Sequence, residues 1–508
     1  MAKQVRVRFA PSPTGGLHIG GLRTALYNYL FARHQGGSFV LRIEDTDQAR
    51  KVAGAEAYIR EALDWAGISP DESPWQGGSY GPYRQSERLD VYRQYAEQLV
   101  ATGHAYYAFD TPEELQAMRE LLQAAKAAQQ QYGIATRKQM TNSLTLPEAE
   151  TRQRLQSGEP FVIRLKVPAD RTVVVEDIIR GRVEVASEQI DDKVLLKSDG
   201  YPTYHLANVV DDHLMQITHV IRGEEWLPSA PLHVLLYQLL GWEDTMPAFA
   251  HLPLLLKPEG SGKLSKRDAD KHGFPIFPLA WTDPRTGEEA AGFREEGYLP
   301  EAVVNFLALL GWNPGTDEEL FDHQRLIELF DLQRINKGGV KFDIEKARWF
   351  NQQYLKNTPA ETLADWFAEQ AARHGVTCPP DKAVAIAGAL RERITLIPDL
   401  WQQGAFFLIA PDSYDEKTAR KKWSPEVAAV LQDFADRLDE KLVQDGEATK
   451  QALWETAQTH GMGIGKVMPG LRLALTGSGG GPDLMTIIAI LGAEETRQRI
   501  ARAVERLG

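Results

Sequence analysis

The chain has 508 residues, which at about 150 residues per domain predicts three to four domains and excludes a peptide-sized or disulfide-stapled scaffold. Apolar residues make up 43% and charged residues 25%, a composition typical of folded globular proteins that excludes a largely disordered chain. The net charge of −13 argues against a uniformly basic protein that coats DNA, although it leaves room for local basic surfaces.

The cysteine content and the hydropathy pattern indicate the compartment in which the protein works. The single cysteine, Cys378, excludes an intramolecular disulfide and a metal site built from cysteines. The N-terminal residues lack the basic and then apolar stretch of a signal peptide, and no segment approaches the ~20 apolar residues of a membrane span. We therefore expect a cytoplasmic protein without membrane contact.

The first part of the chain predicts alternating strands and helices. Residues 5–9 alternate like a strand, residues 18–33 carry apolar side chains at helical spacing, and residues 38–43 predict a second strand. A strand, a glycine-rich turn, a helix and a strand in this order are typical of a parallel α/β unit. Residues 111–150, rich in Glu, Gln, Ala and Leu, predict helix, whereas residues 161–185 predict strands. We interpret this block as an insertion.

The α/β pattern resumes over residues 194–256 and then ends. Beyond Pro300 the sequence predicts long amphipathic helices separated by breaks rich in glycine and proline. The expected fold class is therefore α/β, with an α+β insertion and an all-α C-terminal part.

Two short segments carry residues suited to phosphate chemistry. Residues 11–21 place His18 among glycines where the first expected strand passes into a helix, and a helix N-terminus beside glycines favours bound phosphate. Taken alone, a tight turn with a capping role explains this segment equally well. Residues 263–267, Lys-Leu-Ser-Lys-Arg, form a compact basic loop, which alone is more often a solvated surface.

Together the two segments resemble the signature sequences of class I aminoacyl-tRNA synthetases, His-Ile-Gly-His and Lys-Met-Ser-Lys-Ser. Gly21, Leu264 and Arg267 depart from these patterns in the way that is usual for the glutamate branch. Further segments, in matching order and spacing, resemble the bacterial glutamyl-tRNA synthetase family over nearly the whole chain. They are residues 8–15, 42–47, 81–88, 199–212, 220–226, 465–469 and 471–472.

The resemblance implies a ligase that activates L-glutamate with ATP and Mg²⁺ when tRNA is bound, and then transfers the glutamyl group to the 3′ end of tRNA(Glu). It implies a monomer with a Rossmann-like parallel-sheet catalytic domain. The expected boundaries are 1–110 and 194–299 for the two halves of the catalytic domain, 111–193 for an acceptor-binding insertion, 300–397 for a helical stem-contact domain and 398–508 for an all-α anticodon-binding domain.

The resemblance also implies a role for individual residues. His18, Lys263 and Lys266 would be catalytic, and His18, Gly20 and Lys266 would bind ATP. Glutamate would be bound by Arg8, Ser12, Glu44, Tyr204, Asn208 and Arg222, and tRNA by Asp47, Arg50, Lys337 and Arg472. Guanidinium groups suit carboxylates and a buried carboxylate suits an ammonium group, although each arginine could instead form a structural ion pair.

The sequence argues against a zinc site and leaves the roles of several residues open. Many relatives carry a zinc site that begins with a cysteine pair, but residues 105–110 contain no cysteine, so we expect no zinc. Trp226 either packs beside the substrate or, more commonly for a tryptophan, is buried. Basic residues among aromatic ones around Lys337 are candidate tRNA contacts, or a solvated face over an aromatic core. Residues 274–293 are longer than in many relatives, and nothing in the sequence explains them.

Two other functions compete with the ligase on the sequence alone. A glutaminyl-tRNA synthetase shares the catalytic layout, but Arg222 and the helical C-terminal third favour the glutamyl branch. A catalytically inert tRNA-binding paralogue would have no use for a paired ATP site, and both signature sequences are present.

Overall fold

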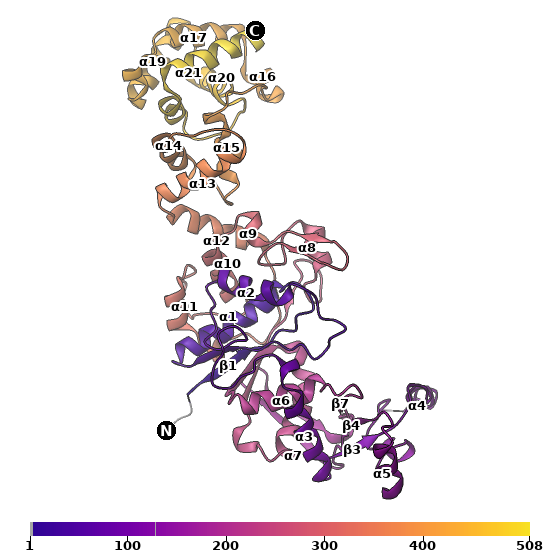
Figure 1. Ribbon diagram of the computed structural model, residues 1–508. Coiled ribbons are helices and arrows are strands. Elements are labelled where there is room, and N and C mark those ends of the chain that lie inside the picture. Colours follow the sequence, from indigo (N-terminus) through magenta and orange to yellow (C-terminus); the bar gives the residue numbers. More distant parts are fainter. Residues whose placement is uncertain (1–3, 128, 508) are drawn as a thin grey trace. The chain divides into compact units, whose positions relative to one another are not determined.

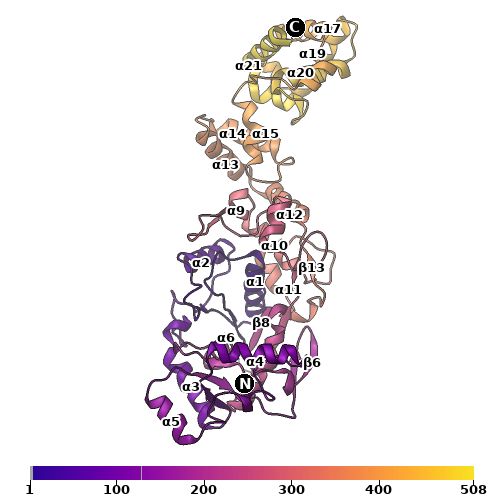
Figure 2. The same ribbon diagram turned by 90° about the vertical axis from the view of Figure 1, so that its right-hand side faces the viewer.

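The computed structural model describes residues 4–127 and 129–507 and divides into two compact units (Figures 1 and 2). The first unit comprises Met1–Glu295 and Val303–Ile344, and the second comprises Glu296–Ala302 and Glu345–Gly508. Each is described below by itself.

The first unit opens with the predicted parallel strand–helix–strand unit. Strand β1 (Arg6–Phe9) pairs in parallel with β2 (Ser38–Leu41), and the partner of Arg6 is Ser38. Helix α1 (Ile19–His34) connects them and buries Leu22, Leu26 and Leu30, which are four residues apart and therefore share one face. The predicted unit is thus confirmed.

A larger sheet continues this arrangement. Its order is β6 (Gly181–Ala186), β5 (Thr172–Asp177), β9 (Ala248–Leu252) and β8 (His219–Gly223), with β5 and β8 each parallel to β9. The backbone N–H of Thr218, just before β8, donates to the carbonyl oxygen of Arg6 at 2.9 Å, which joins this sheet to β1. The carboxyl ends of β1 and β8 consequently carry Arg8 and Arg222, at the edge where open α/β sheets bind ligands.

A smaller antiparallel sheet contains β3 (Ala105–Ala108), β4 (Val162–Leu165) and β7 (Val194–Leu196), with β4 in the middle. The strands predicted within residues 161–185 are confirmed as β4, β5 and β6, and the last two belong to the larger sheet. The prediction of helix throughout residues 111–150 is wrong for residues 125–127 and 129–147, between α4 (Pro112–Ala124) and α5 (Glu148–Gln156), and residue 128 lies outside the described residues. Here the buried Asn142 amide donates to the carbonyl oxygens of Arg137 and Met140, which stabilises an irregular loop.

The remaining elements of the first unit surround these sheets. They are α2 (Ala55–Trp65), α3 (Leu89–Ala101), α6 (Tyr204–Leu214), α7 (Ala230–Leu239), α8 (Lys266–His272), α9 (Phe293–Glu296), α10 (Pro300–Leu309), α11 (His323–Leu329), β10 (Leu255–Leu256), β11 (Trp281–Thr282), β12 (Glu289–Ala290) and β13 (Val340–Lys341). Helices α9 and α10 each cross a boundary between the units.

The second unit is helical, as predicted. Its helices are α12 (Ile344–Asn357), α13 (Ala360–Arg373), α14 (Pro380–Leu390), α15 (Asp399–Gly404), α16 (Glu416–Lys422), α17 (Pro425–Asp436), α18 (Glu440–Val443), α19 (Gly446–Thr459), α20 (Ile464–Thr476) and α21 (Leu484–Leu507). The buried Arg499 of α21 donates to the carbonyl oxygens of Phe406 and Leu475 and so ties α21 to the end of α20. Within the described ranges, no helix has the length and apolarity to cross a membrane.

Candidate active site

A cleft of about 1140 Å³ opens in the first unit at the carboxyl ends of β1 and β8. Its walls are the loop after β1, the loop after β2, the start of α6, the end of β8 and the chain before α8. It brings together the predicted residues Arg8, Ser12, His18, Gly20, Glu44, Asp47, Arg50, Tyr204, Asn208, Arg222, Lys263 and Lys266. Lys337 and Arg472 do not line it; Lys337 is exposed, and Arg472 lies in the second unit and donates to the carbonyl oxygen of Pro482 at 2.7 Å.

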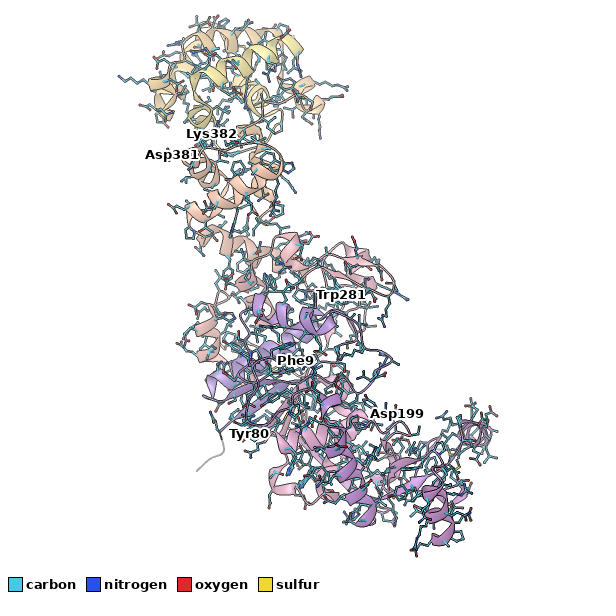
Figure 3. The ribbon with its side chains drawn as sticks, in the orientation of Figure 1. Phe9, Tyr80, Asp199, Trp281, Asp381 and Lys382 are labelled. Atoms are coloured by element: carbon cyan, nitrogen blue, oxygen red, sulfur yellow. The ribbon has the colours of Figure 1, made fainter. Side chains whose placement is uncertain are left out.

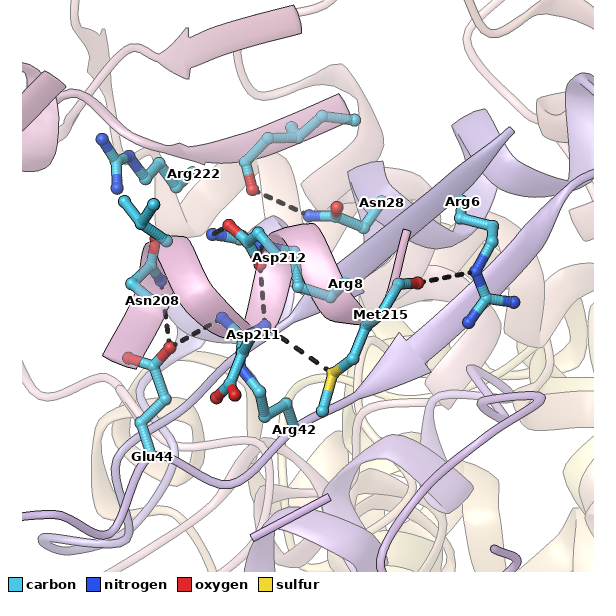
Figure 4. Close-up of polar contacts among 12 residues, drawn as sticks. Arg6, Arg8, Asn28, Arg42, Glu44, Asn208, Asp211, Asp212, Met215 and Arg222 are labelled. Carbon is cyan, nitrogen blue, oxygen red and sulfur yellow. Dashed lines mark hydrogen bonds and ion pairs between the residues drawn. The ribbon is translucent and has the colours of Figure 1, made fainter. Parts of the chain in front are cut away.

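Helix α6 supplies one wall through side chains at helical spacing. Tyr204 and Asn208 are four residues apart, and Asp211 and Asp212 follow one turn later, so these side chains share one side of the helix. The amide of Asn208 donates to Glu44 at 3.1 Å, and Arg42 holds the same carboxylate at 2.9 Å (Figure 4). Glu44, which follows β2, is therefore fixed at the cleft by groups from two elements.

The charges behind this wall balance each other. Arg8 donates to Asp212 from Nε at 3.0 Å and from Nη2 at 3.2 Å, and Arg42 donates to the same carboxylate at 2.7 Å. Burial opposes ionisation of Asp212, but these two guanidinium groups hold its pKa below the usual value. Arg88 pairs with Asp211 at 2.7 Å. The three arginines thus face three carboxylates, namely Glu44, Asp211 and Asp212.

Arg222 differs from these three arginines because its hydrogen-bond partners are neutral. Its Nε donates to Nε2 of His251 at 3.0 Å and its Nη1 donates to the Tyr204 hydroxyl at 2.7 Å. Its Nη2 contacts the carbonyl oxygen of Trp226 at 3.5 Å. Burial raises the pKa of Tyr204 to about 12, so that hydroxyl is uncharged at neutral pH. Across the part of the chain that the structure describes, no carboxylate lies within 4.0 Å of Arg222, so its positive charge is available to an anionic ligand.

The other end of the cleft carries His18 and the two lysines. Nδ1 of His18 accepts the backbone N–H of Gly20 at 3.2 Å, so His18 does cap α1, and its Nε2 is left to carry the proton. Burial, reinforced by Lys263, lowers the pKa of His18 to about 4. Lys263 pairs with Glu225 at 2.8 Å and Lys266 pairs with Glu288 at 2.8 Å. His18 therefore both caps α1 and lines the cleft.

Residues 274–293, which the sequence left unexplained, pack against the loop that carries His18. The backbone N–H of Ile19 donates to the carbonyl oxygen of Ile276 at 2.9 Å. Trp281, labelled in Figure 3, lies against Gly16, where an added Cβ would come within 2.8 Å of its ring. The Tyr58 hydroxyl of α2 donates to the carbonyl oxygen of Leu279 at 2.6 Å. The segment thus supports one wall of the cleft from behind.

Two predicted residues lie at the rim. Asp47 and Arg50 form an exposed ion pair at 2.5 Å, and the Arg50 guanidinium lowers the pKa of Asp47. Trp226 is 41% exposed and its ring centroid lies 4.4 Å from that of Tyr204, so the expectation of a buried tryptophan is wrong.

Two of the aromatic residues near Lys337, Phe342 and Phe350, belong to the core, whereas Trp349 is half-buried. Phe342 and Phe350 are each 1% exposed and cannot stack on bases, whereas the basic side chains of α16 are exposed. Among the described side chains, no group of three or more His, Cys, Asp or Glu could hold a metal ion.

The sequence did not predict the residues that form ion pairs or hydrogen bonds with the predicted site residues. Arg42, Asp211 and Asp212 occur in the motifs that carry the resemblance, yet their ion pairs join positions about 170 residues apart. His251 and His233, which contact Arg222, belong to no motif. The available signal was the presence of charged residues inside apolar segments.

Comparisons with known proteins agree with this geometry. Residues 4–349 match the family described as tRNA synthetases class I (E and Q), catalytic domain, and residues 345–504 match the family described as anticodon binding domain. The chain is 60% identical over 503 residues to a glutamate–tRNA ligase of Cytophaga hutchinsonii, covering 99% of this chain and 97% of that one. It is 56% identical over 507 residues to the glutamate–tRNA ligase of Porphyromonas gingivalis, covering 100% and 99%.

A solved structure agrees as well. A glutamate tRNA ligase from Elizabethkingia meningosepticum, crystallised in complex with its amino acid, superposes with a TM-score of 0.95 at 52% identity and with complete coverage of both chains. The family match, the relatives and the superposition all extend over the whole length of the cleft-bearing unit. The chain therefore belongs to the glutamate–tRNA ligase family of class I tRNA synthetases.

Proposed function

We propose that the cleft joins L-glutamate and ATP to form glutamyl-adenylate and pyrophosphate, and then transfers the glutamyl group to the 3′ end of tRNA(Glu) with release of AMP. The observation that carries this proposal is the charge of Arg222, which faces the cleft without a carboxylate partner among the described residues. The side-chain carboxylate of glutamate would supply that partner. Glutamine carries a neutral amide there and would leave the buried charge unpaired.

We assign the other polar groups of the cleft to different parts of the glutamate substrate. Nε and Nη2 of Arg8 hold Asp212, so we assign Nη1 of Arg8 to the substrate, together with the Tyr204 hydroxyl. Glu44 suits the ammonium group, with Asn208 and Ser12 beside it. This assignment places anionic and cationic groups opposite the matching charges of the amino acid.

We assign the opposite end of the cleft to ATP. His18 would donate from Nε2 to a phosphate oxygen as a neutral imidazole, next to Gly20 at the positive end of the α1 dipole. Lys266, with Lys263 as a second cation, would stabilise the charge that builds on the phosphates during the displacement. Mg²⁺ would arrive bound to ATP, with phosphate oxygens among its ligands.

The tRNA would contact the rim and the second unit. Asp47 and Arg50 lie where an acceptor end could enter, and Lys337 and Arg472 are proposed contacts farther along. The family resemblance supports an activation step that requires bound tRNA. The family resemblance supports a cytoplasmic, monomeric enzyme.

The test is a charging assay with purified tRNA(Glu) and tRNA(Gln), in which glutamate and glutamine are supplied separately. Arg222→Ala should raise the KM for glutamate by ~10²-fold, because losing a charge-assisted pair costs about 3 kcal/mol. Arg33→Ala is the matched control, since Arg33 lies in the last turn of α1, pairs with Asp71 and does not line the cleft. An Arg222→Ala enzyme with the wild-type KM for glutamate would reject the assignment.

A further inference from the structure

Behind Arg222 lies a second row of buried side chains. His251 of β9 accepts the Nε–H of Arg222 at 3.0 Å, and its other ring nitrogen, Nδ1, lies 2.6 Å from Oδ2 of Asp177. Asp177 ends β5, and neither side chain is accessible to solvent. Asp177, His251 and Arg222 thus form a hydrogen-bonded line from β5 through β9 to the end of β8.

The direction of each hydrogen bond in this line is fixed by chemistry. A carboxylate only accepts, so Nδ1 of His251 must carry the proton that faces Asp177. A neutral imidazole with a proton on Nδ1 has a lone pair on Nε2, and that lone pair accepts the Nε–H of Arg222. Burial lowers the pKa of His251, which keeps the ring in this neutral form.

The orientation of Asp177 is fixed as well. Its Oδ1 accepts the backbone N–H of Ile179 at 3.0 Å and that of Arg180 at 2.8 Å. Oδ2 alone therefore faces the imidazole. The ring between the two charges keeps the Asp177 carboxylate out of ion-pair distance of Arg222, so the arginine is oriented without being neutralised.

We propose that Asp177 and His251 are positioning residues that set the direction of the Arg222 guanidinium and thereby the preference for glutamate over glutamine. The proposal rests on the role of Arg222 in glutamate binding given above. His233 adds a contact of 3.4 Å from its Nδ1 to Nη1 of Arg222, and its Nε2 lies 3.2 Å from Nδ1 of His205. Because the partners are neutral, the line limits rotation of the guanidinium and leaves its charge for the substrate.

The decisive variant is Asp177→Asn. The two backbone N–H groups retain the amide oxygen at the Oδ1 position, so the NH2 group faces His251 and donates to Nδ1. The imidazole proton then moves to Nε2 and opposes the Nε–H of Arg222, leaving two donors face to face. We expect the KM for glutamate to rise by ~10-fold or more and discrimination against glutamine to fall, with an unchanged KM for ATP.

Adding His251→Gln separates positioning from structure. The glutamine Oε1 can accept from Arg222 whichever residue occupies position 177, so Asp177→Asn/His251→Gln should return the KM for glutamate to within ~3-fold of wild type. His251→Leu, which has no acceptor, is the matched control and should resemble Asp177→Asn. Thermal unfolding and the KM for ATP report on the fold in every variant.

The outcomes are distinct. If the double variant is as impaired as Asp177→Asn or worse, or if the KM values for glutamate and ATP rise together, the line is only structural and the proposal fails. Should Asp177→Asn not fold, equal KM values for glutamate in His251→Gln and His251→Leu would overturn it. A normal KM for glutamate in Arg222→Ala would instead reject the role of Arg222 in glutamate binding on which this proposal rests.

Discussion

At the scale of single residues, the lysines of the basic loop are held by carboxylates. Lys266 pairs with Glu288 and Lys263 pairs with Glu225, and all four side chains are at least one-third exposed. Exposed pairs of this kind contribute little to stability, so each lysine can exchange its carboxylate for a phosphate oxygen at small cost. The pairing keeps the two cations near the proposed ATP site, and the fold does not depend on it.

Lys266→Ala should therefore affect catalysis and leave stability almost unchanged. We expect glutamate-dependent exchange of pyrophosphate into ATP, measured with tRNA present, to fall by ~10²-fold, as for the loss of one preorganised group that stabilises the transition state. Lys271→Ala is the matched control, because Lys271 lies in the last turn of the same helix, α8, and does not line the cleft. Normal exchange in a folded Lys266→Ala protein would remove this lysine from the mechanism.

The sequence predicts the residues that face the cleft better than those that hold them. His18, Glu44 and Arg222 stand in recognisable motifs, and the structure brings them to one cleft. Asp177 and His251 stand in no motif. They come together because β5 pairs with β9, which is far away in the sequence. Such long-range pairing leaves no local pattern to detect.

At the scale of elements, the segment 274–293 acts as a support for the loop that carries His18. It forms the short hairpin of β11 and β12, and Trp281 at its start packs on Gly16 and on the ring of Tyr58. The absence of a side chain at position 16 is what permits this approach. The segment therefore connects the loop that carries His18 to α2.

Gly16→Ala should disturb this packing. Its Cβ would lie 2.8 Å from Cγ of Trp281, closer than carbon atoms tolerate. We expect overpacking to cost about 1–3 kcal/mol and to lower both the melting temperature and the exchange rate. Gly338→Ala is the control, since an added Cβ there meets no atom within 4 Å.

Trp281→Ala tests the same contact from its other side. If the contact is the cause, Gly16→Ala should be much less harmful in a Trp281→Ala background than in wild type. Equal damage in both backgrounds would show that residue 16 acts through another contact.

Elements were predicted well where periodicity was strong and poorly where side chains override it. The helical spacing of apolar residues within 18–33 predicted α1 to within one residue at each end. Within residues 111–150 a helix-favouring composition failed, since buried hydrogen bonds of Asn142 and an ion pair between Arg137 and Asp192 stabilise a loop. Composition reports local preference only, and here tertiary contacts outweigh it.

At the scale of the whole molecule, the cleft and the segment that matches an anticodon-binding domain fall in different units. Every residue that lines the cleft lies in the first unit. The match to an anticodon-binding domain begins at residue 345, and the second unit resumes at Glu345. In that unit α13 and α15 belong together, because Gln370 donates to the carbonyl oxygen of Ile397 and Leu400 is buried. A cut at residue 398 would therefore separate packed helices of the second unit, whereas a cut at residue 344 would remove the whole of that unit except residues 296–302.

A chain that ends at Ile344 should keep its cleft and lose most of its tRNA binding. Tyr298 and Leu299, which belong to the second unit, would lose their cover, so Leu299→Ser should accompany the cut to limit aggregation. We expect charging of tRNA(Glu) to fall mainly through weaker tRNA binding. The logarithm of the binding constant should also fall less steeply with the logarithm of salt concentration, because phosphate contacts are lost. Full-length protein carrying Leu299→Ser is the control, and a truncated chain with the same tRNA affinity and the same salt dependence as this control would show that the second unit does not bind tRNA.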